Sequence, residues 1–419
     1  MWHKDTFILP HIKTAYRYHL KKFEYLCDPI FLCSIAPMKI VVDNKIPYLK
    51  GLLEPFADVV YLSGKDIRKA DLLDADALLV RTRTICNREL LEGTSIRFIG
   101  TATIGFDHID TDYCAVKNIH WVNAPGCNAR AVAQYVTSSI LCFARKYNFS
   151  PAEKTIGIIG VGQVGQKVER CARLLGMNVL LNDPPRARNE GEKNFINLDR
   201  IQIDSDIITF HPILEKEGPD KTWHMADANF FTKLKKPVFL INTARGSIIE
   251  TEALKQAIRE GKVIDCALDC WENEPDIDLD LLESALIATP HIAGYSSDGK
   301  ANATRTIVEQ LNTFLDLKMP PKISLKLPVP EEPVLKIHKN SPHKIASALL
   351  YAYDPIKDSE NLKKSPSTFE EIRGRYVFRR EYKAFRVVNL VETEAEILRA
   401  FGFQTPPRSE MSNTDEYRE

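Results

Sequence analysis

Short apolar segments alternate with amphipathic ones along most of the chain, and this alternation predicts a parallel α/β fold. The apolar segments are rich in β-branched side chains and bounded by turn residues, which is typical of buried strands. These segments are residues 39–43, 59–62, 77–80, 98–100, 121–123, 155–159, 177–181, 205–210, 238–242, 263–269 and 285–289. The predicted helices are residues 48–56, 66–72, 111–117, 126–147, 164–175, 250–261 and 295–317.

Two long helical segments divide this pattern into two doubly wound, Rossmann-like domains. Residues 126–147 carry the chain from the first group of strands into the second, and residues 295–317 return it. The first domain is therefore expected to be discontinuous, and ligands are expected in the cleft beyond the carboxyl ends of the strands. The predicted domains are residues 38–130 with 296–320, and residues 131–295.

A proline-rich stretch, residues 319–333, separates these domains from a third unit. Residues 334–405 are predicted to form a small α+β domain, and the polar residues 406–419 a disordered tail. Residues 1–37 are basic and aromatic without a clear period, and we expect a poorly ordered extension before Met38. Translation starting at Met38 and a genuine, loosely packed extension are both open. The segments of the third unit are residues 334–338, 342–351, 369–375, 386–390 and 392–401.

Composition narrows the class of protein. Lysine plus arginine and aspartate plus glutamate both number 56, so net charge offers no argument for nucleic acid or an anionic membrane as partner. No apolar run reaches the roughly 18 residues that span a bilayer. The nine cysteines are scattered without a C-x-x-C pair, which favours reduced thiols in the cytoplasm over disulfides or a zinc site. Cys266 and Cys270 are predicted to be buried thiols.

One glycine-rich loop joins the strand 155–159 to the helix 164–175. Its residues Gly160, Gly162 and Gly165 make a G-x-G-x-x-G pattern. The first glycine permits a tight turn, the second lets backbone approach a pyrophosphate, and the third lets the helix pack on the strand. The helix N-terminus then presents free N–H groups to the phosphates. This order of elements predicts a dinucleotide site, with a glycine turn in another kind of α/β unit as the alternative.

Asp183 follows the next strand, where a carboxylate can bond the ribose hydroxyls. A 2′-phosphate would meet a like charge there, so Asp183 favours NAD over NADP. Arg186 and Arg188 follow closely and weaken that preference.

Three polar residues follow the later strands, and we expect Arg245, Glu274 and His291 to project into the cleft. Oxidation of a 2-hydroxy acid needs such a set. A histidine accepts the hydroxyl proton as hydride leaves C2, and a carboxylate beside it stabilises the imidazolium. An arginine holds the substrate carboxylate and polarises the forming carbonyl. Taken singly, each has a structural alternative: a satisfied histidine, a surface arginine or a solvated glutamate.

Together these residues resemble the D-isomer-specific 2-hydroxyacid dehydrogenases. The motifs that carry the resemblance are residues 160–165, 242–246, 269–275 and 289–294, and it extends from about Met38 to Leu317. It implies Arg245 as substrate clamp, His291 as acid/base, Glu274 as its partner, NAD as cofactor and no metal ion. The implied NAD site comprises Gly160, Gly162, Gln163, Val164, Gly165, Asp183, Pro212, Thr243, Ala244, Arg245, Asp269 and Gly294.

Further motifs look like one branch of that family, the erythronate-4-phosphate dehydrogenases. They are residues 80–83, 100–108, 123–129, 183–186 and 292–296. The resemblance implies oxidation of 4-phospho-D-erythronate by NAD to 2-oxo-3-hydroxy-4-phosphobutanoate, a step toward pyridoxal phosphate. It implies substrate contacts from Thr82, Thr103 and Tyr295, and a C-terminal domain that makes a homodimer, for which residues 334–405 offer room.

Two positions depart from the family pattern. Pro212 stands where a threonine is usual, and proline offers neither an N–H donor nor a hydroxyl. Gln134 stands where a glutamate is usual. We expect neither change to abolish activity.

A terminal phosphate needs cations of its own, because Arg245 serves the carboxylate end of the substrate. Arg81 and Arg83 are the predicted ligands, since both follow a buried strand and alternate residues of an extended segment point the same way. A solvated surface charge is the alternative for Arg83. Arg379 and Arg380, from a partner chain, are further candidates.

Two other functions stay open. The first is dehydrogenation of another phosphorylated D-2-hydroxy acid, such as 3-phosphoglycerate. The second is an NAD-sensing binding module, since related folds serve as corepressors of the C-terminal-binding-protein type. The intact set of Arg245, Glu274 and His291 argues against a binding module, and turnover of an added substrate would separate the two.

Overall fold

Strands that are apolar on both faces build two parallel sheets, which form the frame of the chain. The computed structural model describes residues 38–338 and 340–407. The predictions for residues 1–37, and for the tail from residue 408 onward, lie outside the described residues. The described residues from Lys39 onward belong to one compact unit.

The first sheet has five strands in the order β2-β1-β3-β4-β5, and every neighbouring pair is parallel. Three of its strands, β1, β3 and β4, have almost entirely buried residues. Its strands are β1 (Lys39–Asp43), β2 (Asp58–Leu62), β3 (Ala77–Val80), β4 (Phe98–Thr101) and β5 (His120–Val122), and its helices are α1 (Arg88–Leu91) and α2 (Thr111–Val116).

The second sheet has six parallel strands in the order β11-β10-β9-β8-β6-β7. The chain turns from β6 to β7 on one side and then returns to β8 on the other, so the strand order reverses beside β6. Ligands of doubly wound sheets bind beyond the carboxyl ends of strands at such a reversal. The strands are β6 (Thr155–Ile159), β7 (Asn178–Asn182), β8 (Ile207–Phe210), β9 (Val238–Asn242), β10 (Val263–Leu268) and β11 (Ile287–Ala288).

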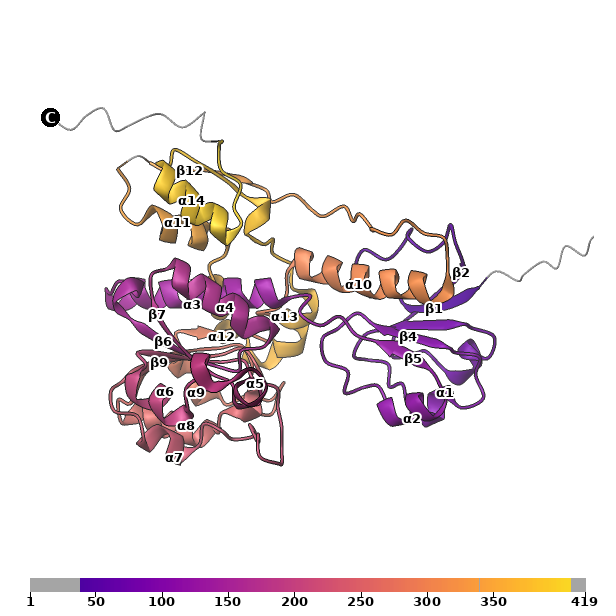
Figure 1. Cartoon of the computed structure of the whole chain (residues 1–419), viewed down its shortest axis with the longest axis horizontal. Helices are drawn as coiled ribbons and strands as arrows, with labels where there is room; N and C mark the ends of the chain where they lie inside the picture. The colour runs from indigo at the N-terminus through magenta and orange to yellow at the C-terminus, as the bar shows by residue number, and fades with distance from the viewer. Residues whose placement is uncertain (1–37, 339, 408–419) are drawn as a thin grey trace, which may run out of the picture. The chain divides into compact units, whose positions relative to one another are not determined.

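Helices cover both faces of the second sheet, and the alternation of side chains along its strands explains why. In β9, Val238 and Leu240 join one core cluster, whereas Phe239 and Ile241 join the other. The helices α3 and α4 pack on one face and α6 to α9 on the other (Figure 1). These helices are α3 (Ala129–Tyr147), α4 (Gln163–Leu174), α5 (Pro184–Glu190), α6 (Leu198–Asp204), α7 (Ala228–Thr232), α8 (Thr251–Arg259) and α9 (Leu279–Ser284).

Helix α10 (Ser297–Leu315) returns the chain from the second sheet to the first. Its Ile307 lies so close to β4 that a side chain at Gly100 would meet it at 3.2 Å, and its Thr304 hydroxyl donates to the Pro47 carbonyl at 2.6 Å. This packing agrees with the predicted return of the chain, although the domain boundaries themselves stay predictions.

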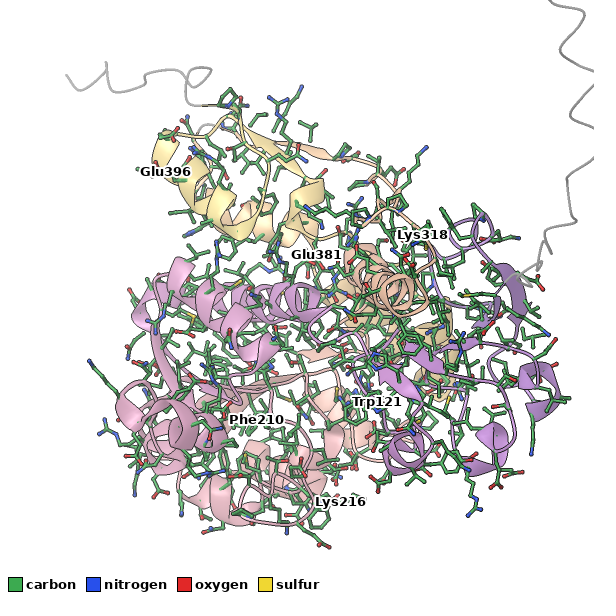
Figure 2. The ribbon with its side chains drawn as sticks, turned by 45° about the vertical axis from the view of Figure 1, so that its right-hand side comes forward. Trp121, Phe210, Lys216, Lys318, Glu381 and Glu396 are labelled. Atoms are coloured by element: carbon green, nitrogen blue, oxygen red, sulfur yellow. The ribbon has the colours of Figure 1, made fainter. Side chains whose placement is uncertain are left out.

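The C-terminal segment forms a small cluster and also contacts the second sheet. β12 (Val334–Lys336) pairs with β13 (Arg386–Val388), and α11 (Lys344–Ala352) and α14 (Glu392–Phe401) pack on them. Between these elements, α12 (Ile356–Lys364) and α13 (Phe369–Arg375) leave the cluster. Their side chains Leu362 and Phe369 join a core of the second sheet. Figure 2 labels Glu381, whose buried carboxylate accepts the Ser296 hydroxyl at 2.9 Å just before α10 begins.

The predicted strands are present with small shifts at their ends, and the α/β fold class is confirmed. The predicted helix 48–56 is wrong, because Tyr48 and Gly51 adopt positive φ angles and the segment runs as turns. The predicted helix 66–72 shortens to a 3₁₀ turn. Helix α12 was missed because the sequence IKDSENLKK has little apolar periodicity. The 3₁₀ helices are η1 (Lys69–Leu72), η2 (Pro151–Glu153), η3 (Glu192–Asn194), η4 (Gly246–Ile248), η5 (Pro366–Thr368) and η6 (Tyr382–Ala384).

Composition also led to two expectations, one about the cysteine thiols and one about membrane-spanning helices. The cysteines of the described ranges are free thiols, and Cys266 and Cys270 are buried as predicted. None of the helices in residues 38–338 and 340–407 combines the length and the apolar character needed to cross a membrane.

Candidate active site

Three predicted catalytic residues follow three neighbouring strands of the second sheet. Arg245 follows β9, Glu274 lies in the loop after β10, and His291 follows β11. Because parallel strands end at the same edge of a sheet, the three side chains share that edge. The strand order thus places residues that are 46 positions apart in the sequence, from 245 to 291, on one edge.

Glu274 and His291 form a directly bonded pair. Nδ1 of His291 lies 2.9 Å from Oε2 and 3.2 Å from Oε1 of Glu274, and the Trp271 N–H donates to Oε1 at 2.9 Å. Burial lowers the pKa of His291, but Cys270 and the Glu274 carboxylate outweigh burial and raise that pKa well above 6.5. Burial works against ionisation of Glu274, yet His291 holds the pKa of Glu274 below its usual value. The pair therefore favours imidazolium and carboxylate, and Nε2 is the nitrogen that remains to exchange a proton.

Asp269 holds the loop that carries His291. One carboxylate oxygen accepts the Thr289 hydroxyl at 2.6 Å and the Ile292 N–H at 2.7 Å, and the other accepts the Ala293 N–H at 2.9 Å. His291 itself has a φ of 57°, a left-handed conformation that needs such support. Asp269 was predicted to line the NAD site. In the structure its bonds position the catalytic loop, and a cofactor contact stays a prediction.

Arg245 presents an exposed side chain at the same edge. Its Nη1 donates to the Ala244 carbonyl at 2.9 Å, and a side chain at Gly105 would stand 3.5 Å from its Nη2. The guanidinium therefore lies against the loop after β4, which belongs to the first sheet. A side chain at Gly246 would collide with the Trp271 backbone at 1.9 Å, so only glycine lets the loops after β9 and β10 approach this closely.

The glycine loop after β6 has the geometry of a phosphate cradle. Gly160 has a φ of 82°, and a Cβ there would meet Pro212 N at 2.4 Å, while one at Gly165 would meet the Gly160 carbonyl at 2.2 Å. A Cβ at Gly162 would meet nothing within 4 Å, so the loop is open at the position where a pyrophosphate approaches. Gly162 caps α4 without a side-chain bond, which leaves the first N–H groups of Gln163 and Val164 available. These residues fit the pyrophosphate of NAD.

Asp183 lies beside this loop. Its carboxylate accepts the Val161 N–H at 2.7 Å and caps α5 through the Arg186 N–H at 3.0 Å. The arginines that weakened the preference for NAD are both occupied: Arg186 pairs with Glu190 at 2.7 Å, and Arg188 pairs with Asp220. Neither guanidinium is therefore free to take a 2′-phosphate, so the structure adds support for NAD.

His211 and Pro212 close the other side of the loop. The His211 ring joins Thr209 at 2.9 Å and Thr243 at 3.1 Å, and burial lowers the pKa of His211 to about 3, so the ring is neutral. Pro212 packs with its backbone against Gly160. The departure at Pro212 thus keeps the shape of the loop although it offers no donor.

Gly294, after β11, and Gln163, the first residue of α4, both pack against the segment that leads into α3. A Cβ at Gly294 would meet Asn128 Nδ2 at 2.1 Å, and one at Gly126 would meet Gln163 Oε1 at 2.9 Å. The glycine loop and the histidine loop therefore both contact the segment that leads into α3. The predicted cofactor residues all follow strands of the second sheet, from β6 to β11, and their contacts with NAD stay predictions.

The predicted substrate residues follow β3, β4 and β11, and their contacts with a substrate stay predictions. Arg81 is half-buried and donates to the Lys45 carbonyl at 3.2 Å, and the Thr103 hydroxyl donates to the Gly105 carbonyl at 2.8 Å. Thr82 is exposed. Arg83 is 75% exposed and pairs with Glu370 at 3.1 Å, so the surface-charge alternative describes it better.

Aromatic and basic side chains of the C-terminal segment pack around Tyr295. The sequence predicted Tyr295 as a substrate contact but did not predict this packing. The rings of Tyr376 and Phe378 contact the Tyr295 ring edge to face, at 6.2 and 6.0 Å. Lys300 stands over the same ring at 3.9 Å. The only signal in the sequence was the run of basic and aromatic residues between 373 and 380.

Arg379 is the second residue whose role was missed. All five of its N–H donors are used: Nε bonds Gln134 Oε1, Nη1 bonds the Ile292 and Tyr295 carbonyls, and Nη2 bonds the Ala131 and Ala293 carbonyls. The guanidinium also stacks on Tyr353 at 4.0 Å. Arg379 therefore clamps the histidine loop. Arg380 pairs with buried Asp298, so both arginines are engaged within their own chain, and a phosphate contact from a partner chain stays a prediction.

One trio of described residues has the spacing of metal ligands, and it coincides with the catalytic pair. Cys270, Glu274 and His291 hold their ligand atoms within 4.8 Å of one another. Burial raises the pKa of Cys270, and its thiol donates to the Ala244 carbonyl at 3.4 Å. The bonded carboxylate and imidazole of this trio are arranged for proton transfer.

Family models match two parts of the chain. Residues 134–293 match the D-isomer specific 2-hydroxyacid dehydrogenase, NAD binding domain. Residues 326–402 match a Domain of unknown function (DUF3410). The NAD-binding assignment of the second sheet is thus confirmed.

Curated relatives match most of the chain. Erythronate-4-phosphate dehydrogenase of Bacteroides thetaiotaomicron is 51% identical over 84% of this chain and 100% of its own length. The enzymes with that name from Porphyromonas gingivalis and Edwardsiella ictaluri are 44% and 40% identical over 87% of this chain and 100% and 99% of theirs.

Solved structures share the fold. D-lactate dehydrogenase from Aquifex aeolicus, complexed with NAD and lactic acid, has a TM-score of 0.53 at 26% identity and covers 66% of this chain and 95% of its own. A glyoxylate reductase from Paecilomyes thermophila has a TM-score of 0.56 at 22% identity and covers 70% and 99%. The chain therefore belongs to the D-isomer specific 2-hydroxyacid dehydrogenase family, within its branch of erythronate-4-phosphate dehydrogenases.

Proposed function

We propose that the chain oxidises 4-phospho-D-erythronate to 2-oxo-3-hydroxy-4-phosphobutanoate with NAD, as a step of pyridoxal phosphate biosynthesis. The observation that carries the proposal is the His291–Glu274 pair, bonded at 2.9 Å, at the sheet edge that also presents the glycine loop. The substrate is taken from the relatives that carry the name erythronate-4-phosphate dehydrogenase, at 40 to 51% identity.

His291 serves as the base in the oxidation. Glu274 holds Nδ1, so Nε2 accepts the proton of the C2 hydroxyl, and the carboxylate stabilises the imidazolium that forms. Because the pKa of His291 is raised, the neutral ring that oxidation needs becomes more populated as the pH rises. In the reverse direction the imidazolium supplies the proton.

Arg245 serves as the substrate clamp. Its exposed guanidinium can hold the substrate carboxylate with two parallel bonds and polarise the C2 oxygen as a carbonyl forms. Asp269 and Arg379 keep the His291 loop in place from two sides. The glycine loop would hold NAD, which would supply the acceptor for the hydride that leaves C2.

The test is formation of NADH by the purified full chain with a panel of 2-hydroxy acids. The expected result is the highest kcat/KM for 4-phospho-D-erythronate, lower values for 3-phosphoglycerate, and lower values again for D-erythronate. Highest turnover of 3-phosphoglycerate would favour the alternative substrate. NAD binding without turnover of any acid would favour a binding module.

We also propose that the chain works in the cytoplasm as a homodimer joined through residues 334–405. The support is the free thiols and the apolar residues Val334 and Val391, which are exposed on the C-terminal cluster. Sedimentation of the full chain should give a dimer, and Val334→Glu with Val391→Glu should give a monomer. A dimer that is unchanged in the double variant would place the interface elsewhere. The cytoplasmic location is tested separately, by cell fractionation.

A further inference from the structure

A group of positive side chains surrounds Tyr295, and the catalytic pair does not use it. Lys300, in the first turn of α10, stands 3.9 Å from the centre of the Tyr295 ring and 5.5 Å from that of Phe378. Arg81 comes from the loop after β3, and Arg373 comes from α13 in the C-terminal segment. The positive charges of Arg81 and Arg373 both act on Lys300, so three segments that are distant in the sequence bring cations near one another.

Lys300 is half-buried and has no carboxylate partner among the described residues. Burial, together with the positive charges of Arg81 and Arg373, lowers the pKa of Lys300 to about 8. Like charges that are held together at partial burial cost free energy unless an anion joins them. The arrangement therefore has a charge pattern that an anionic ligand would complete.

Arg373 has spare hydrogen-bonding capacity at the same place. Its Nη1 reaches Glu370 at 3.3 Å; burial works against the charge of Arg373, but Tyr295 outweighs burial and raises the pKa of Arg373. Its Nε is buried without a hydrogen-bond partner, although its side chain is still 28% exposed. A buried donor without a partner is uncommon and marks a position where a ligand acceptor is expected.

The position of the group relative to the catalytic pair suits the far end of a short acid. Tyr295 lies four residues beyond His291, and Arg373 interacts electrostatically with Glu274 as well as with Lys300. Arg245, in contrast, lies against the loop after β4. A substrate with two anionic ends therefore finds one cation at its carboxylate and a separate group for the other end.

We propose that Lys300 and Arg373, together with Arg81, bind the terminal phosphate of the substrate, and that they replace Arg83 in that role. The inference rests on the proposed function, because it names the residues that recognise its phosphate. It also gives the C-terminal match of unknown function, residues 326–402, a direct part in substrate binding through Arg373. Arg83 reaches this group only through Glu370, whose carboxylate bridges Arg83 and Arg373, and the Arg83 side chain itself is 75% exposed.

Two variants test the proposal: Lys300→Met and Arg373→Gln, each in the full chain. Charge-assisted bonds contribute roughly 1.5–3 kcal/mol, so each variant should lose about ten- to a hundredfold in kcat/KM for 4-phospho-D-erythronate. Each should lose less than about threefold for D-erythronate, which has no phosphate. Arg375→Gln is the matched control, because Arg375 lies on the same helix, 81% exposed and paired with Glu371, and it should change neither value.

Direct binding of inorganic phosphate separates this inference from the proposed function. Titration calorimetry should detect phosphate binding to the wild-type chain and to the Arg375→Gln variant, and a large loss with Lys300→Met. Lys300→Arg keeps the positive charge and should retain most of the phosphate binding. That result would show that the loss in Lys300→Met comes from the missing charge and not from a failure to fold.

Equal losses on both acids, or unchanged phosphate binding in both variants, would overturn the phosphate site. A large loss with Arg83→Gln on the phosphorylated acid alone would return that role to Arg83. If wild-type protein binds phosphate through these residues but prefers an acid other than 4-phospho-D-erythronate, the site stands and the proposed substrate is wrong.

Discussion

The loops after β9 to β11 and the segment from Phe369 to Glu381 meet around Tyr295, but they are held in place by different kinds of contact. In the loops, partners are close in sequence: Glu274 and His291 are 17 residues apart, and Asp269 and Thr289 are 20 apart. In the segment, Arg379 bonds Ala293, 86 residues away, and Ala131, 248 residues away. The catalytic pair is thus positioned by the local geometry of a parallel sheet, whereas its surroundings depend on long-range packing.

This difference suggests separate roles for the two regions: the loops carry the reacting groups, and the segment holds them in place. The loops carry His291 and Glu274, which we propose move the proton, and loss of these side chains should abolish turnover without unfolding the chain. The segment carries a buried guanidinium with all five donors engaged, and its loss should weaken the fold and the site together. Four substitutions sharpen or break this distinction.

The largest effect is expected for His291→Asn, which removes the proton acceptor. General acid–base groups contribute about 10²- to 10⁴-fold, so kcat should fall by that factor while NAD affinity and thermal unfolding stay near wild type. Steady-state kinetics and NAD titration measure both quantities. Near wild-type kcat would show that another group takes the proton.

Arg379→Met should act on the other region, because it leaves buried carbonyls of the His291 loop without donors. Breaking a buried charged network costs about 3–5 kcal/mol, so the midpoint of chemical unfolding should fall markedly and kcat with it. Arg375→Met, on the exposed face of the same segment, should stay within about 0.5 kcal/mol of wild type. An Arg379 variant as stable as this control would contradict the clamp.

Glu274→Gln should shift a pH profile more than it changes stability. The carboxylate helps to raise the pKa of His291, so the amide should lower that pKa. Oxidation needs the neutral ring, so the acid limb of kcat/KM for oxidation should move to lower pH. Reduction needs the imidazolium, so as the pH rises the variant should lose reductase activity at a lower pH than wild type does. Glu272→Gln is the control, because Glu272 bonds His224 at 2.7 Å and not His291. An unmoved acid limb would mean that Glu274 does not set the pKa.

The smallest effect is expected for Gln134→Glu, which introduces the glutamate usual in the family. Gln134 Oε1 accepts Arg379 Nε at 3.3 Å, and a carboxylate there would make a stronger, charge-assisted bond. The gain should be about 1 kcal/mol in the free energy of unfolding, with activity unchanged. Lower stability would indicate that the nearby tyrosines already balance the charge of Arg379.

Much of the fold followed from the sequence because strands and loops depend on neighbours in the chain. The apolar runs at 39–43 and 238–242 lie in the sheet centres as predicted, and Gly160, Gly162 and Gly165 form the expected loop. His291 and Glu274 meet because strand order in a parallel sheet brings the ends of β10 and β11 together.

Only the tertiary structure distinguished between residues that look alike in sequence. Arg83 and Arg373 are both arginines beside polar residues, but one is solvated and the other is partly buried with an unpaired Nε. The segment 48–56 has a helical pattern, but positive φ angles at Tyr48 and Gly51 make it turn. Pattern and spacing report what a residue does with neighbours in the chain. Burial and charge partners are set by residues up to 248 positions away. They show that Arg379 is engaged within the chain, and they are the basis of the role proposed for Lys300 and Arg373.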